Sequence, residues 1–193
     1  LIIYALFPAK GIFQQVVVMY VFFGVIPILF NKFILKNNFN VFGIRIGNWR
    51  QGLVFGGANL FISGALFFLG VYLFDFFRKR GVPETIVFSF KNFLFYETIL
   101  VLPVIFIYDL FFRGFIVSTL KTKLGYWVIA LQTVLFFGLV FGSGSFSFSI
   151  IPFLINAPLA GWLAYKSESI LYSTLFQFVA LVILDTGMIF LIK

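Results

Sequence analysis

The stretch QGLVFGGANLFISGALFFLGVYLF, residues 51–74, contains no charged side chain and decides the fold class. A helix rises about 1.5 Å per residue, so about 20 apolar residues cross the roughly 30 Å hydrocarbon core of a bilayer. Three further charge-free runs cover residues 11–31, 124–165 and 169–184. Together these runs predict helices that span a membrane.

The composition of the 193-residue chain also indicates a membrane protein, since 62% of its residues are apolar, 10% are charged and the mean hydropathy is +1.12. So few charged residues cannot cover a water-facing surface, which excludes a soluble fold. A net charge of +8 would suggest nucleic acid in a soluble chain. Here the bases stand at the ends of apolar runs, where lipid headgroups are the nearest anions. Membrane lipids are therefore expected partners, and nucleic acid is not.

The spacing of the charged residues predicts an all-α, polytopic bundle of about six spanning helices in a multi-pass integral membrane protein. The expected helices cover residues 11–30, 52–76, 94–120, 125–141, 150–165 and 169–191. Residues 1–9 either begin the first helix or end one that precedes the sequence. The chain has no internal repeat and no long linker, so residues 1–193 are expected to form a single transmembrane domain.

Polar connections separate these helices. Residues 31–50 surround Trp49 with bases, which is typical of a segment anchored at the headgroup level, although lipid binding by this segment is an alternative. Residues 75–91 indicate a helix end, a turn and a new start, and residues 142–149 a tight turn or short extended stretch. The bases divide six to seven between the two sides and predict no orientation. One side holds Lys10, Arg78, Lys79, Arg80, Lys91 and Lys193, and the other Lys32, Lys36, Arg45, Arg50, Lys121, Lys123 and Lys166.

Asp109 and Arg113 are ionisable residues in the middle of the third predicted helix. Inserting such a group at the middle of a membrane helix costs a free energy of roughly 2.5–3.5 kcal/mol on insertion scales. Each of them is therefore expected to have a structural or functional role. Residues four apart lie about 40° apart on one helix face, so the two side chains can pair. They are either a buried ion pair that fixes helix packing or what remains of a polar site.

The other polar residues within the apolar runs are expected to have structural roles. Amides such as Gln132 and Gln177 can bond across helices, and Asn156 can meet carbonyls freed by the neighbouring prolines. Glu97 is expected in the first turn of the third helix, where its charge suits the helix dipole, and Asp185 at the membrane interface. The sequence has no His and no Cys. This excludes imidazole bases, thiol nucleophiles and the usual zinc ligands, so we expect no metal and no cofactor.

The stretch Tyr108-Asp109-Leu110-Phe111-Phe112-Arg113-Gly114 resembles the E-E-x-x-x-R-G motif of the CAAX protease and bacteriocin-processing (CPBP, or Abi) family of intramembrane proteases. In this resemblance Tyr108 stands at the position of the first glutamate and Asp109 at that of the second. Arg113 and Gly114 are retained.

Two later stretches extend the resemblance. Leu135-Phe136-Phe137-Gly138-Leu139-Val140-Phe141 looks like the family's L-L-F-G-L-x-H, with Phe137 kept and Phe141 where the histidine belongs. The segment SILYSTLFQ, residues 169–177, resembles S-L-W-x-P-I-L-x-H, which puts Gln177 at the second histidine and Leu181 at a following asparagine. The resemblance covers about residues 95–185, and a segment similar to the family's L-G-L-R precedes it at residues 42–45.

The resemblance implies a CPBP-like helix bundle in which the first glutamate and the histidines would activate water. Those groups are absent here, so the expected function is that of a catalytically inactive scaffold or accessory subunit, with another integral membrane protein as its partner. An active intramembrane peptidase that relies on Asp109 is the first alternative, and a channel or transporter is the second. The small-residue sites 56–58 and 64–65 would let a partner backbone come close.

Overall fold

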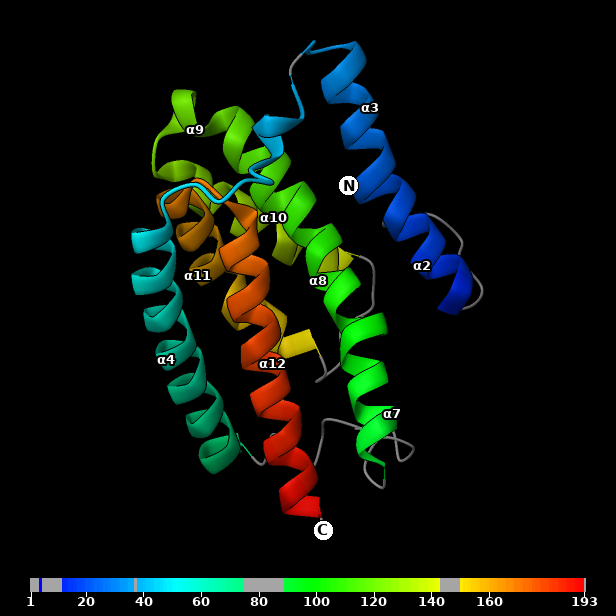
Figure 1. Cartoon of the computed structure of the whole chain (residues 1–193), viewed down its shortest axis with the longest axis vertical. Helices are drawn as coiled ribbons and strands as arrows, with labels where there is room; N and C mark the ends of the chain where they lie inside the picture. Colours follow the sequence, from blue (N-terminus) through cyan, green and yellow to red (C-terminus); the bar gives the residue numbers. More distant parts are fainter. Residues whose placement is uncertain (1–3, 5–11, 37, 75–88, 143–149, 193) are drawn as a thin grey trace.

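The computed structural model describes residues 4, 12–36, 38–74, 89–142 and 150–192, and the regular elements of this part are all helical (Figure 1). The predictions for residues 1–9, 75–88 and 143–149 lie outside the described residues, apart from Tyr4. Consecutive helices join end to end into continuous rods, and the described residues form six of them.

The rods follow the predicted helices closely. The first joins α2 (Ile12–Tyr20), a π-helical stretch (Val21–Val25) and α3 (Ile26–Phe33), and the second is α4 (Trp49–Phe74). The third joins α7 (Phe90–Phe95), a π-helical stretch (Tyr96–Val101), α8 (Leu102–Asp109), a second π-helical stretch (Leu110–Val117) and α9 (Ser118–Leu124). The remaining rods are α10 (Trp127–Gly142), α11 (Ile151–Ser167) and α12 (Ile170–Ile192).

Four rods are long and apolar enough to cross a membrane, at Gln14–Phe33, Trp49–Gly70, Phe90–Leu124 and Ile170–Phe190, and α10 is a shorter apolar helix. The prediction of an all-α, multi-pass bundle of about six helices is confirmed. The predicted place of Glu97 in the first turn was wrong, because the third rod begins at Phe90 and Glu97 lies about two turns inside it, 1% exposed. Asp185 is likewise buried within α12.

Prolines explain two of the π-helical stretches. Pro27 and Pro103 each occupy the first turn of an α-helix that directly continues a π-helical stretch. A proline inside a helix has no N–H for the usual bond to the carbonyl four residues earlier, and its ring crowds that carbonyl. A locally wider turn relieves this crowding without ending the rod.

Helix α11 lies at the centre of the bundle and packs against α4, α10 and α12. Its small buried residues Ala157, Ala160, Gly161 and Ala164 allow these close approaches. The outward faces carry large apolar side chains instead. At least 70% of the surface is exposed in each of five such residues: Phe61, Phe68, Phe90, Trp127 and Phe190. Contact with lipid permits this exposure.

The connection between the first two rods is fastened to the turn between α11 and α12. The N–H of Ile170 donates to the Gly43 carbonyl at 3.0 Å, and the N–H of Asn48 donates to the Ser167 carbonyl at 2.8 Å. Arg45 forms an ion pair with Glu168 at 3.1 Å, and Lys121 of α9 forms a second one with the same carboxylate at 2.9 Å. This contact, which we call the Glu168 latch, joins three parts of the chain at one end of the bundle.

We predict that the Glu168 latch stabilises the fold less in acid than at neutral pH. The hydrogen bond and charge of Lys121, and less strongly the charge of Arg45, hold the pKa of Glu168 below its usual value. A carboxyl whose pKa is lowered in the folded state contributes stability at neutral pH, and this contribution is lost as the pH falls through the lowered pKa. We therefore expect the difference in melting temperature between wild type and Glu168→Gln in detergent to shrink from pH 7 to pH 3. A difference that stays constant over this range would contradict the prediction.

Candidate functional site

Asp109 ends α8 in the interior of the bundle, and its side chain is fully buried. Its Oδ1 accepts a hydrogen bond from Arg113 Nη1 at 2.7 Å and from Gln177 Nε2 at 2.9 Å. Its Oδ2 accepts from Ser173 Oγ at 2.6 Å, from Thr174 Oγ1 at 2.8 Å and from Gln177 Nε2 at 3.0 Å. We call these five residues the Asp109 cluster.

The geometry of the Asp109 cluster satisfies the carboxylate. An ionised carboxylate offers about four lone-pair positions, and here four side chains supply the donors. The charged Arg113 and the short hydroxyl hydrogen bonds all converge on this one carboxylate. Asp109 and Ser173 have no exposed surface, so water has no access to the carboxylate from outside. Within the described residues, no group of three His, Cys, Asp or Glu side chains could hold a metal ion.

Arg113 lies in the π-helical stretch that follows Asp109 and connects the cluster to α10 and α11. Its Nη2 donates to the Ala157 carbonyl at 3.4 Å, and its guanidinium lies 5.9 Å from the centroid of the Phe136 ring. Gln132 of α10 donates to the same Ala157 carbonyl at 2.8 Å. A Cβ at Gly161 would overlap this amide, so a larger residue there would require the Gln132 side chain to move.

Three of the residues singled out by the motifs meet in the Asp109 cluster: Asp109, Arg113 and Gln177. Leu181 lies one turn further along α12 and is buried in a separate apolar cluster that includes Ile105. It therefore does not contribute to the polar site.

The motif positions on α10 and at Tyr108 lie apart from the carboxylate. Tyr108 packs among aromatic rings, 5.5 Å from Phe23 and 5.7 Å from Phe136 between centroids. Phe137 is half-buried and Phe141 is 58% exposed. The face of α10 that looks into the bundle instead carries Gln132, Phe136 and Val140, which recur every four residues.

Ser173 and Thr174 are site residues that the sequence alone did not reveal. Both belong to the segment that resembles a family motif, and with Gln177 they follow an i, i+1, i+4 spacing that places polar groups on one face of α12. This spacing was the available signal. Hydroxyl residues are common in membrane helices, however, and only the packing of α12 against α8 shows that these two reach Asp109.

A second, smaller polar contact joins α4 to α11. The Ser63 hydroxyl donates to Asn156 Oδ1 at 2.8 Å and lies 3.0 Å from Asn59 Oδ1. Asn156 Nδ2 in turn donates to the Pro152 carbonyl at 3.0 Å. All three side chains are buried, so this contact fixes α4 against α11.

The fold and the site define a multi-pass helical membrane protein with a closed polar cluster in its interior. Residues 90–183 match the family model described as type II CAAX prenyl endopeptidase Rce1-like. This range contains the Asp109 cluster and all the motif positions, and it confirms the resemblance to the CAAX protease family over this part of the chain. Comparison with curated proteins and with solved structures gives no match in either set.

Proposed function

We propose that this protein is a catalytically inactive relative of the CAAX proteases that serves as a scaffold or accessory subunit in the membrane. The observation that carries this proposal is the saturated, fully buried carboxylate of Asp109. A general base needs a free lone pair within hydrogen-bond reach of its water, and Asp109 has none to offer.

The residues that the family resemblance associates with water activation also favour loss of activity. Tyr108 replaces the first glutamate, and its ring lies among aromatic side chains. The sequence contains no histidine at all. An active peptidase would therefore have to work with an aspartate that is paired with Arg113 at 2.7 Å. Such a pair stabilises helix packing but activates water poorly.

We expect the purified protein in liposomes not to cleave prenylated peptides. The measurement is product formation by mass spectrometry, with an active CAAX endopeptidase in matched liposomes as the positive control. Because Asp109 has no free lone pair, Asp109→Asn should give the same background as wild type. Turnover by wild type that Asp109→Asn abolishes would show that the site is catalytic.

The scaffold part of the proposal needs a surface for a membrane partner, and the outer face of α4 fits this role. Gly57 and Gly64 lie one heptad apart, and beyond the local turn of α4 no atom of the described residues lies within 4 Å of a Cβ placed on either. Gly56 differs, because a Cβ there would collide with the Phe176 ring of α12. Open glycines on one face let a second helix approach closely, so we place the partner helix along Gly57 and Gly64.

This surface is tested by blocking it with larger side chains. We expect the double variant Gly57→Leu/Gly64→Leu to keep the melting temperature of wild type. It should, however, no longer copurify in mild detergent with a stoichiometric membrane partner protein. Gly138→Leu on α10 is the matched control, because no described residue beyond the local helix turn comes within 4 Å of its Cβ position either. A companion that remains with both variants would contradict the assignment to α4, and companion loss with Gly138→Leu alone would move the surface to α10.

A further inference from the structure

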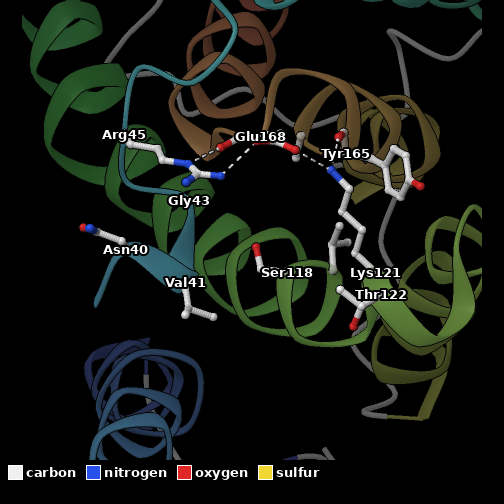
Figure 2. Close-up of a pocket in the computed structure, with 11 residues that line it drawn as sticks. Asn40, Val41, Gly43, Arg45, Ser118, Lys121, Thr122, Tyr165 and Glu168 are labelled. Carbon is white, nitrogen blue, oxygen red and sulfur yellow. Dashed lines mark hydrogen bonds and ion pairs between the residues drawn. The ribbon is translucent and has the colours of Figure 1, made fainter. Parts of the chain in front are cut away.

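A second polar feature lies at the end of the bundle that carries the Glu168 latch, separate from the Asp109 cluster. It is a pocket of about 530 Å³ between the connection that precedes α4, helix α9 and the end of α11. Figure 2 shows Arg45, Glu168 and Lys121 arching over this space, with Ser118 opposite them.

The charges around the pocket leave a positive excess. Among the described residues that line the pocket, Glu168 is the only carboxylate, and Arg45 and Lys121 share it. Two bases against one acid give the lining one net positive charge. Arg45 directs Nε and Nη2 to Glu168, which uses two of the five N–H groups of a guanidinium. Within the part of the chain that the structure describes, the other guanidinium N–H groups have no partner, so they can donate to a ligand.

The walls combine polar and apolar groups. Ser118, Thr122 and Asn40 supply hydroxyl and amide groups, whereas Val117 and Ala164 supply a buried apolar surface. Helix α9 begins and helix α11 ends beside this pocket. Lys121 Nζ also donates to the Tyr165 carbonyl near the end of α11, at 3.1 Å. A ligand with an anionic group next to an apolar group would match such a lining.

Glu168 itself adopts an unusual backbone conformation. Its φ is 56° and its ψ is 29°, the left-handed region that glycine enters at least cost, yet a carboxylate residue stands at this helix end. Left-handed residues other than glycine persist where surrounding contacts hold them, and they cluster at binding sites. Here the contacts are the two ion pairs of the pocket rim.

We propose that this pocket binds the headgroup phosphate of an anionic phospholipid. Arg45 and Lys121 donate to the phosphate oxygens, and the Ser118 hydroxyl lies where it can donate a third hydrogen bond. A phosphodiester with one negative charge balances the net charge of the lining. We favour a lipid over free phosphate because the pocket lies among helix ends and close to the start of α4, where the exposed Trp49 is of the residue type that is enriched at headgroup level. This inference does not depend on the proposed scaffold function.

The test measures lipid binding to the full chain after delipidation in mild detergent, by native mass spectrometry and thermal shift. The probes are phosphatidylglycerol, phosphatidylcholine, glycerol 3-phosphate and inorganic phosphate. We expect phosphatidylglycerol to bind with the highest affinity and to raise the melting temperature most. Lys121→Met should weaken its binding about tenfold, the effect of one lost charge-assisted hydrogen bond, and Ser118→Ala should weaken it less.

Two further variants separate specific binding from general attraction. Lys123→Met removes a base from the same helix α9 but outside the pocket, and it should leave the affinity within about twofold of wild type. Glu168→Gln removes the competing carboxylate, so it should tighten phosphatidylglycerol binding even though it weakens the latch. This opposite sign is not expected from a variant that merely disturbs the fold.

Three results would overturn the proposal. Equal binding of phosphatidylglycerol and phosphatidylcholine would remove the anionic selectivity. Equal losses with Lys121→Met and Lys123→Met would show attraction by the whole surface. Saturation by inorganic phosphate or glycerol 3-phosphate, with no gain from the lipid form, would identify a soluble phosphate ligand instead.

Discussion

Asp109→Leu is expected to destabilise the helix bundle by about 3–5 kcal/mol, because it leaves Arg113 charged and buried without its counter-ion. Arg113 would retain only a long bond to the Ala157 carbonyl at 3.4 Å and the face of Phe136. For a chain of this size, the loss corresponds to a fall in melting temperature on the order of 10 °C in detergent. Circular dichroism during heating measures it.

Arg113→Met should cost less than Asp109→Leu, because Ser173, Thr174 and Gln177 still donate to the carboxylate. The double variant should recover much of the loss, since it leaves no unpaired charge. In the double variant, the side chains that donate to Asp109 in wild type still have other acceptors. Ser173 Oγ lies 2.9 Å from the Ile170 carbonyl, and Gln177 Nε2 lies 3.1 Å from the Ser173 carbonyl. A double variant as unstable as Asp109→Leu alone would show that the pair is not self-compensating.

Gly114→Ala is the second substitution with a large expected effect. A Cβ at Gly114 would lie 2.7 Å from the backbone oxygen of Phe42, which is too close for real contacts and cannot be relieved by a side-chain rotation. The third rod or the connection before α4 would have to move. Overpacking of this kind costs about 1–3 kcal/mol, and the melting temperature in detergent should fall accordingly.

Gly138→Ala provides the matched control for Gly114→Ala. In the described part of the chain, no atom beyond the local turn of α10 lies within 4 Å of a Cβ placed on Gly138. Alanine is favoured over glycine in a helix by about 1 kcal/mol, so this variant should be as stable as wild type or slightly more stable. Equal destabilisation by both substitutions would refute a specific contact between Gly114 and Phe42.

Hydropathy alone determined the fold class and the number of helices. Six rods were predicted because charged or polar segments interrupt the apolar part of the chain, and an apolar segment of about 20 residues can cross the bilayer as a helix. The spacing of Asp109 and Arg113 similarly predicted their contact, since residues four apart share a helix face and the observed bond is 2.7 Å long. These features depend on short stretches of the chain.

Only the tertiary structure decided which faces of the helices meet. The motif spacing on α10 indicated Phe137 and Phe141 as the site positions, whereas the face that packs in the bundle carries Phe136 and Val140. In a helix that is apolar all round, periodicity does not distinguish the buried face from the lipid-facing one. The partners of Asp109 on α12 and the Glu168 latch likewise join residues more than forty positions apart. Their contacts depend on how each rod is rotated about its own axis and on how the π-helical stretches change the face that the rod turns to its neighbours. A local pattern of residues predicts neither.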